Sequence, residues 1–179
     1  MDNELLNDDL MNLKFTRKKQ KSNNDKFSNI INDENFFLNP SFEIVLNNPT
    51  IKDVNIKHLT IKCVTNDIEK LKTISEKIIE KFKSTITFDN SVKIYDIGDE
   101  YIRCCLPSVW SPYTYKKGNY ICSFFLNNEK ININSNTIKS LQKYNVNKII
   151  IEVKNIWKSN DVYAFNNIIK EVYLTDVFN

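Results

Sequence analysis

NKIIIEVKNIWKSNDVYAFNNIIKEVYL, residues 147–174, is the stretch that decides how this 179-residue chain is expected to fold. Its first half follows the two-residue period of a β-strand, with Ile149, Ile151 and Val153 on one face and Ile150, Glu152 and Lys154 on the other. The polar residues 159–161 predict a turn, and a second apolar run follows at 168–174. The stretch therefore predicts an antiparallel hairpin with one buried face and one face toward water.

Upstream of this hairpin the chain is rich in β-branched and aromatic residues, which favour strands. We expect strands at 42–46, 56–64, 91–97, 101–106 and 120–126. Two segments differ. Apolar residues recur every three or four positions in 67–83, after an Asn66 and Glu69 spacing typical of a helix cap, and a shorter helix is expected at 137–144. The predicted class is mainly β with two helices.

The first 35 residues differ in composition from the rest. They hold seven acidic and six basic residues, including Arg17-Lys18-Lys19, and few apolar ones. Burying this few apolar residues does not offset the conformational entropy that is lost when the chain is ordered. We therefore expect a flexible, charged tail at 1–35 with a short helix near 5–15. One folded domain is expected at 36–179. The basic cluster suits phosphate contact or a localisation signal, although such clusters are commonly only solvated.

Short strands interrupted by helices predict an OB-like antiparallel β-barrel for the folded domain. The curvature of such a barrel usually requires glycine at bulges and tight turns, and this chain has two glycines. Asn is the next best residue at a left-handed backbone position, so we expect Asn to replace glycine there. The net charge of +3 permits a polyanionic partner without requiring one.

The four cysteines, Cys63, Cys104, Cys105 and Cys122, form no CxxC pair. Cys104 and Cys105 are adjacent and would point to opposite faces of a strand, so we expect reduced thiols. Together with His58 the cysteines lack the spacing of zinc ligands, and neither a metal nor a cofactor is expected. The sequence has no long apolar run and no signal-peptide pattern, which predicts a soluble intracellular protein, in the cytoplasm or nucleus, with no membrane partner.

Residues 110–120, WSPYTYKKGNY, combine aromatic rings with lysines in a segment that Pro112 and Gly118 keep from being helical. Rings beside cations suit a groove that stacks unpaired bases while cations meet phosphates. The candidate stacking rings are Trp110, Tyr113, Tyr115 and Tyr120, and the candidate phosphate contacts are Lys116, Lys117 and Arg103. An ordinary loop whose rings pack on the sheet below explains the same residues.

The hairpin of 147–174 resembles the closing hairpin of single-stranded DNA-binding proteins of phages and large DNA viruses. In that family a strand ends in a tryptophan, an Asn/Asp turn follows, and an aromatic residue leads into a final strand. KGNYICSFFLNNEK, at 117–130, is similar to the basic, glycine-containing lead-in and aromatic strand of the same family. The resemblance covers residues 100–175. This chain has Ala164 where the family tends to have glycine, and its C-terminus carries few acidic residues.

The resemblance implies an OB-fold protein, not an enzyme, that coats unpaired DNA during viral or phage-like replication, recombination or repair. It further implies replication proteins and a homo-oligomer as partners to test for. The closing hairpin contains Trp157, flanked by Lys154 and Lys158 as candidate phosphate contacts, although a tryptophan that ends an apolar strand is often a cap on the core. Phe124 and Phe125 point to opposite faces of a regular strand, so one of them is expected in the core.

Catalysis has little support in the sequence. No phosphate-binding glycine loop, dinucleotide fingerprint or nucleophile elbow occurs, and His58 has no identifiable nucleophile partner. The acidic residues around Gly98 are more typical of a turn than of a metal cluster. The competing interpretation is a β-sandwich interaction protein or virion-associated structural protein with no nucleic-acid role. Salt-sensitive oligonucleotide binding favours the first interpretation, and an exposed apolar patch with oligomerisation favours the second.

Overall fold

The computed structural model describes residues 11–19, 34–86, 94–95, 100–110, 117–159 and 162–177, which are mainly β with two helices, as the sequence predicts. The strands are β1 (Lys14–Lys19), β2 (Glu34–Asn47), β3 (Thr50–Val54), β4 (His58–Lys62), β5 (Ile94–Tyr95), β6 (Tyr101–Cys105), β7 (Ser108–Trp110), β8 (Lys117–Tyr120), β9 (Ser123–Leu126), β10 (Glu129–Ile131), β11 (Asn145–Ser159) and β12 (Val162–Thr175). The helices are α2 (Thr65–Thr85) and the 3-10 helix η1 (Ile138–Lys143).

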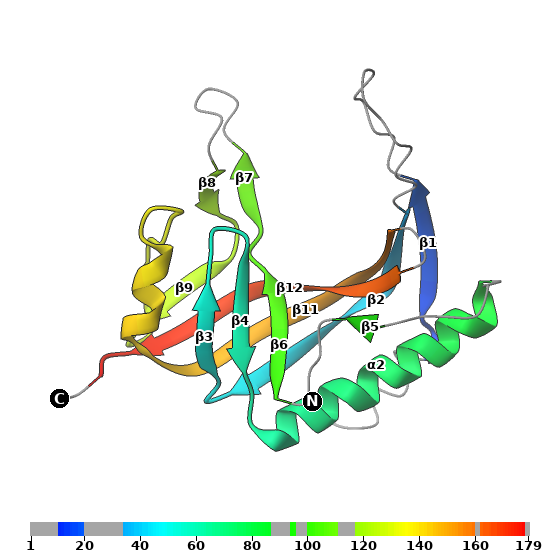
Figure 1. The fold of residues 1–179 in the computed structure, drawn as a ribbon, viewed down its shortest axis with the longest axis horizontal. Helices are drawn as coiled ribbons and strands as arrows, with labels where there is room; N and C mark the ends of the chain where they lie inside the picture. The colour runs from blue at the N-terminus through cyan, green and yellow to red at the C-terminus, as the bar shows by residue number, and fades with distance from the viewer. Residues whose placement is uncertain are drawn as a thin grey trace.

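Strands β2, β11 and β12 form the centre of the sheet and run side by side in Figure 1. β11 pairs antiparallel with β12, which confirms the predicted hairpin, and its other edge pairs antiparallel with β2. Ile149, Ile151 and Val153 are each at most 2% exposed, so the alternation identified the buried face. The return strand is longer than predicted, because β12 begins at Val162.

The sheet bends where β12 meets β6. The second edge of β12 pairs in parallel with three short strands in turn: with β5 at Tyr163 and Ala164, with β6 at Ile168, and with β9 at 171–174. β6 continues antiparallel with β4, and β4 with β3. Figure 1 shows these three strands crossing β2, β11 and β12 steeply.

Ten of the described strands form this one sheet, while β7 and β8 pair separately. Closing the sheet into the predicted barrel would require the edges of β1 and β3, at the two ends of the strand order, to pair with each other. Among the described strands they do not, so the sheet is open.

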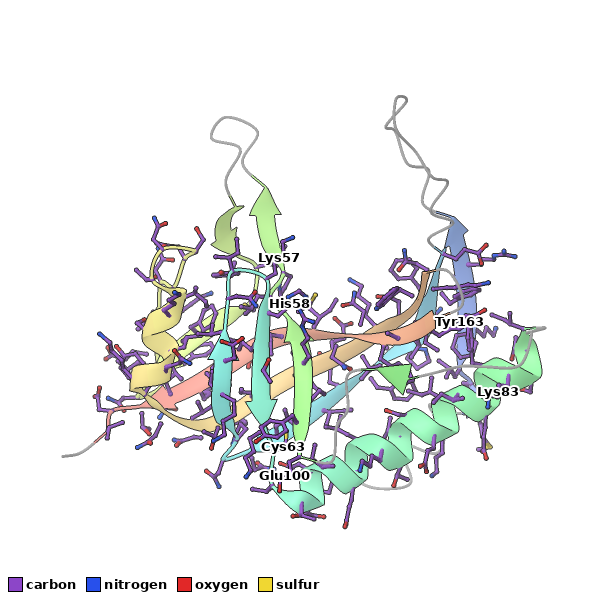
Figure 2. All side chains as sticks on the ribbon, in the orientation of Figure 1. Lys57, His58, Cys63, Lys83, Glu100 and Tyr163 are labelled. Atoms are coloured by element: carbon purple, nitrogen blue, oxygen red, sulfur yellow. The ribbon has the colours of Figure 1, made fainter. Side chains whose placement is uncertain are left out.

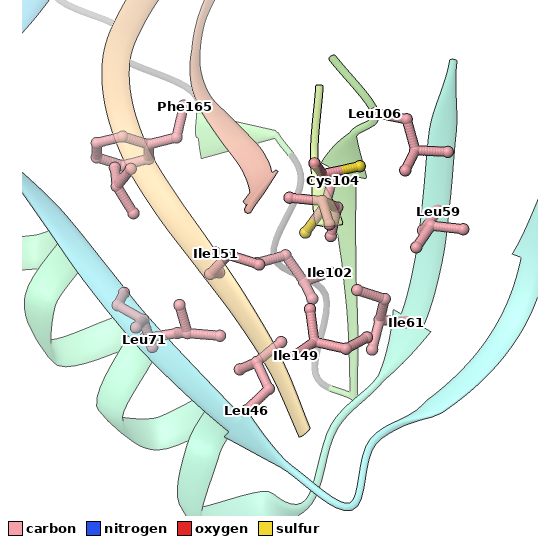
Figure 3. Packing of buried hydrophobic residues seen from close by; sticks show 14 of the residues in the cluster. Leu46, Leu59, Ile61, Leu71, Ile102, Cys104, Leu106, Ile149, Ile151 and Phe165 are labelled. Carbon is pink, nitrogen blue, oxygen red and sulfur yellow. The ribbon is translucent and has the colours of Figure 1, made fainter. Parts of the chain in front are cut away.

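The core lies between the crossing strands. Leu46 of β2 and Ile149 of β11 face Ile61 of β4 and Ile102 of β6 (Figure 3), and all four side chains are fully buried. Full burial of side chains of this size contributes roughly 1.5 to 3 kcal/mol each before entropy is counted. Ile149 belongs to the β2–β11–β12 part of the sheet, and Ile61 and Ile102 belong to the strands that cross it. Their packing therefore stabilises the bend between the two parts.

Helix α2 covers the rest of the core, along the lower side of the molecule in Figure 1. Its buried side chains follow the predicted three-and-four spacing: Ile68, Leu71, Ile74, Ile78, Ile79 and Phe82. The Phe82 ring packs edge-on against Phe36 of β2, with 5.0 Å between ring centroids. The predicted cap is not seen, because the residue before the helix is Val64 and makes no side-chain cap. Instead, the buried carboxylate of Asp67 accepts a 2.7 Å hydrogen bond from the backbone N–H of Asn47.

Residues 14–19 form β1, within the stretch for which the sequence analysis predicts a flexible tail. β1 pairs antiparallel with β2 over its whole length. Leu13 is 3% exposed, and the Phe15 ring lies 4.9 Å from the Phe82 ring. Two apolar residues are therefore enough to attach this segment, because α2 and β2 supply the remaining surface.

Asparagine occupies the left-handed turn positions, as predicted. Asn48, between β2 and β3, has φ of 44°, and Asn127 and Asn128, between β9 and β10, have φ of 51° and 69°. Two consecutive residues with positive φ match the right-handed twist of a tight hairpin. The sheet therefore obtains its sharp turns without glycine at these positions.

All four cysteines are free. Cys104 is fully buried and Cys105 is partly exposed, so the two thiols point to opposite faces of β6, as predicted. Within the described ranges, no helix is long and apolar enough to cross a membrane.

Candidate nucleic-acid interface

A hollow of about 270 Å³ lies beside the point where β6 pairs with β12, with Cys105 opposite Ile168. It is lined by His58, Arg103, Cys105, Trp157, Phe165, Asn166 and Asn167. These residues come from β4, β6 and the β11–β12 hairpin, so the bend in the sheet brings together three separate parts of the chain. We refer to this set as the Trp157 hollow.

The β4–β6 ladder positions the first wall. His58 lies directly opposite Cys105, and Thr60 lies opposite Arg103. Arg103 Nη2 lies 3.2 Å from His58 Nδ1. Since a guanidinium only donates, the imidazole accepts at Nδ1 and carries its hydrogen at Nε2. The Asn55 side chain fixes the turn before His58 by accepting hydrogen bonds from the backbone N–H groups of Lys57 and His58, at 2.9 and 3.0 Å.

Arg103 is the cation of the hollow. Its side chain is exposed, and among the described residues no carboxylate forms an ion pair with it. Three other cations do have such partners: Arg17 pairs with Glu34, Lys62 with Glu100, and Lys170 with Glu43. Arg103 is thus available to an anion from solution, while its contact with His58 restrains its position.

Trp157 also lies in the wall of the hollow and is 36% exposed. A change of register between Val153 and Asn155 reverses the alternation of β11, so that Ile156 is buried and Trp157 is turned to the other face. Ala164 lies directly opposite Trp157 on β12.

A ladder of side-chain amides supports this wall. Asn166 donates to Asn155 Oδ1 at 3.0 Å, and Asn155 donates to Asn35 Oδ1 at 2.9 Å, which joins β12, β11 and β2. Asn155 is 3% exposed, so these bonds satisfy a buried amide and resist water. Asn35 and Ala164 are the neighbours of Trp157 on β2 and β12, so the ladder lies beside the indole.

Asn167 has a side-chain nitrogen for which the described part of the chain offers no acceptor. Its side chain is 3% exposed, and its Nδ2 makes no hydrogen bond within the described part of the chain. It belongs to the lining of the Trp157 hollow. A buried donor without an acceptor is uncommon in folded proteins and calls for an explanation.

Of the residues selected from sequence, Arg103 and Trp157 come together in this hollow. Lys154 is exposed on β11, three positions from Trp157. Lys158 has its ammonium 5.5 Å from the centroid of the ring of Tyr163, which lies near the start of β12 (Figure 2). Because successive residues of a strand alternate, Lys158 points to the face opposite Trp157.

Tyr120 differs from the expected stacking ring. It is 8% exposed, its ring packs edge-on against Phe124 at 6.1 Å, and its hydroxyl donates to the carbonyl of Ile56 at 3.2 Å. Burial raises the pKa of this hydroxyl. A ring enclosed in this way has no open face for a base. Phe124 is the core residue of the Phe124 and Phe125 pair, and Phe125 stacks instead on Tyr173, with 4.7 Å between centroids.

The remaining candidates belong to the aromatic segment. Tyr113, Tyr115 and Lys116 lie outside the described residues. The backbones of Trp110 and Lys117 lie opposite each other in the β7–β8 ladder.

Sequence reasoning did not select His58, Asn166 or Asn167 for the site. The contact of His58 with Arg103 follows from the pairing of β4 with β6, which no local sequence pattern reveals. The burial of Asn167 likewise follows from the sheet and has no signal in the sequence. In the described ranges no three His, Cys, Asp or Glu side chains group as metal ligands. Asp96 and Asp99, from the acidic turn around Gly98, are outside those ranges.

The hollow thus combines an exposed indole, a phenyl ring and a cation that pairs with no carboxylate among the described residues. That combination can stack a flat ring and donate hydrogen bonds to it or to an adjacent anion. No protein-family model matches the chain, and no curated protein matches it in sequence. The function is therefore inferred from these side chains.

Proposed function

We propose that this protein binds single-stranded DNA with little sequence preference and coats unpaired strands during replication, recombination or repair, as the phage and viral proteins that its closing hairpin resembles do. The observation that carries the proposal is that the exposed Trp157 and Arg103 line the same hollow. An indole stacks on any base, and a guanidinium binds any phosphate, so the pair suits a strand of arbitrary sequence.

The mechanism follows from the positions of these groups. A base stacks on Trp157 while the adjacent phosphates approach Arg103 and the exposed Lys154. His58 restrains the guanidinium, so less entropy is lost when a phosphate binds. The OB-like architecture belongs to this proposal: OB folds bind oligonucleotides on the face and loops of a curved sheet, and the bend between β12 and β6 supplies such curvature here.

The test is a fluorescence-anisotropy titration of labelled oligo-dT of about 30 nucleotides, a length that spans several OB-fold site sizes. We expect Trp157→Leu to weaken binding by about 1 to 3 kcal/mol, the usual contribution of one stacking ring, and Trp157→Phe to retain much of it. Circular dichroism of each variant checks the fold. If the wild-type protein does not bind at low salt, or if Trp157→Leu binds as tightly as the wild type, the proposal is wrong.

A second candidate is a protein-interaction module, and one observation favours it. Ile121 is 67% exposed and Ile56 is 46% exposed, and the Tyr120 hydroxyl joins the segments that carry them by its bond to the Ile56 carbonyl. Two exposed isoleucines on adjoining segments are the kind of apolar surface that binds protein. Self-association in sedimentation velocity that Ile121→Asp abolishes, without any DNA binding, would favour this candidate.

A further inference from the structure

Cys105 differs from the other three thiols of the chain. Cys63, Cys104 and Cys122 are each at most 8% exposed, and burial raises the pKa of Cys63 and of Cys122 to about 12. Thiols in such surroundings are chemically inert, because the thiolate is the reactive form. Cys105 is only partly buried and lies in the lining of the Trp157 hollow. It is therefore the cysteine that a small molecule in the hollow meets.

The pairing of β4 with β6 places an imidazole beside this thiol. His58 lies directly opposite Cys105, and the next pair, Lys57 and Leu106, is joined by a 2.7 Å hydrogen bond from the Leu106 N–H to the Lys57 carbonyl. Hydrogen-bonded and non-hydrogen-bonded pairs alternate along an antiparallel ladder, so His58 and Cys105 form a non-hydrogen-bonded pair. The Cα atoms of such a pair are about 4.5 Å apart, which brings the two side chains close together.

A guanidinium lies on the same face of the ladder. Arg103 is two residues before Cys105 on β6, and its Nη2 lies 3.2 Å from Nδ1 of His58. Arg103 forms an ion pair with no carboxylate among the described residues, so its charge is not neutralised by a neighbour there. A positive charge beside a partly exposed thiol favours the thiolate. Cys105 thus has the surroundings of a reactive cysteine, which the three buried thiols lack.

We propose that Cys105 is a modification site that forms a mixed disulfide with a small anionic disulfide, such as glutathione disulfide, and that this modification closes the Trp157 hollow to DNA. The thiol gives its proton to solvent, and its sulfur attacks one sulfur of the disulfide. A new S–S bond forms, the old S–S bond breaks, and the departing thiolate takes up a proton. Cys105 is oxidised and the departing half of the disulfide is reduced. Excess thiol reverses the step.

The charge of Arg103 sets the class of reagent. Glutathione carries carboxylates, which Arg103 attracts, whereas a disulfide with ammonium groups is repelled. Once attached, the tripeptide occupies the hollow that Trp157 also lines, and its carboxylates compete with phosphate for Arg103. The effect on DNA rests on the proposed function, while the reaction of the thiol is independent of it.

The first experiment treats the native protein briefly with glutathione disulfide, alkylates the remaining thiols and identifies the modified cysteines by peptide mass spectrometry. We expect Cys105 to react at least about tenfold faster than each of the other three thiols, which react only after local opening of the fold. The difference should disappear in concentrated urea, and Cys105→Ser should lack the fast reaction. Equal rates for the four thiols in the folded protein would overturn the modification site.

The second experiment tests Arg103 by comparing the rate with glutathione disulfide to the rate with cystamine, a disulfide that carries two ammonium groups. We expect Arg103→Ala to lower the ratio of these rates by about twofold to fivefold, the usual weight of one exposed charge pair. Lys130→Ala, which removes an exposed cation outside the hollow, is the matched control and should keep the ratio. If Arg103→Ala also keeps it, the preference for an anionic disulfide is wrong.

The third experiment connects the modification to DNA. We expect bound oligo-dT to slow the reaction of Cys105, and the glutathione adduct of the wild type to bind oligo-dT more weakly until dithiothreitol restores it. Cys105→Ser should lose no affinity on the same treatment. If the adduct binds oligo-dT as tightly as the unmodified protein, the modification does not close the hollow and the proposed function stands. If Cys105 reacts selectively but no oligo-dT binds, the proposed function is wrong and the modification site stands.

Discussion

At the scale of single residues, the two sides of the Trp157 hollow offer different interactions. Trp157 provides a surface for stacking, which is insensitive to salt, while Arg103 provides a charge, which displaces counterions when it meets a phosphate. In the proposed mechanism each residue has its own effect on the salt dependence of binding, so one experiment separates the two roles.

Replacing Arg103 should change how binding depends on salt. For single strands, the slope of log K against log salt decreases in magnitude by about 0.7 for each phosphate contact that is lost. We expect Arg103→Ala to reduce the slope by that amount, and Trp157→Leu to lower affinity at every salt concentration with the slope unchanged. Anisotropy titrations at four salt concentrations measure both. Equal slopes for wild type and Arg103→Ala would show that Arg103 meets no phosphate.

The buried thiols predict a loss of stability at alkaline pH. Burial raises the pKa of both Cys63 and Cys122 to about 12, and the nearby Asp67 carboxylate adds to the shift of Cys63. In the unfolded chain a thiol ionises near about 8.5, so above that pH the unfolded state releases protons that the folded state retains. Stability is therefore unaffected by these thiols below about pH 8.5 and falls as pH rises toward the folded pKa, by roughly 1 kcal/mol per pH unit for each thiol.

Urea unfolding between pH 8 and 10.5 should show this fall in the wild type and a shallower one in Cys122→Ala. The exposed residues of both proteins titrate alike, so the difference in slope reports the thiol. Parallel curves would mean that Cys122 is not protonated preferentially in the fold.

At the scale of elements, β1 and α2 depend on each other. β1 contributes Phe15 to a ring cluster with Phe82 of α2, and β2 adds Phe36 to the same cluster. Neither β1 nor the last turns of α2 would bury this surface alone. The stability of a strand near the N-terminus thus depends on a helix residue, Phe82, that lies more than sixty positions after Phe15 in the chain.

Truncating Phe15 tests this dependence. We expect Phe15→Ala to lower the free energy of unfolding by about 2 to 3 kcal/mol, at or below the low end of the range for Phe truncation because the ring is only partly buried. Met11→Ala is the matched control, since Met11 is 70% exposed. Urea unfolding followed by circular dichroism measures both. If Phe15→Ala is as stable as the control, the packing of β1 on α2 does not stabilise the fold, and this prediction is wrong.

The start of α2 depends on Asp67 in place of a conventional cap. Asp67→Ala leaves the Asn47 N–H without its acceptor, so we expect a loss of about 1 to 3 kcal/mol in the free energy of unfolding. Glu69→Ala, at an exposed position in the same turn, should change stability by less than about 0.5 kcal/mol. If the two variants unfold at the same urea concentration, Asp67 does not anchor the helix to β2.

At the scale of the whole molecule, the sequence predicted those features that arise from local periodicity. The alternation at Ile149 to Val153 and the three-and-four spacing of α2 were read correctly, because each repeats the geometry of its own element. β1 was missed because Leu13 and Phe15 are buried by partners far along the chain. Arg103 and Trp157 were selected separately, for their chemistry. Their shared position in one hollow, and the contact of His58 with Arg103, depend on how β4 and β6 pair and on where β6 pairs with β12, which no local pattern in the sequence reveals.

The order of the strands has a consequence for how the protein is made. β2 is synthesised early, yet it pairs with β11, which is synthesised about a hundred residues later. Ile44 and Leu46 therefore cannot pair with Ile151 and Ile149 until β11 has been made. Until residues 145–175 have left the ribosome, β2 has an apolar face and an unpaired edge exposed to other chains. The nascent chain therefore folds late, and a product that stops before β11 should aggregate or be degraded. A chaperone that covers β2 during translation would raise the yield of this protein more than that of a protein whose neighbouring strands are adjacent in sequence.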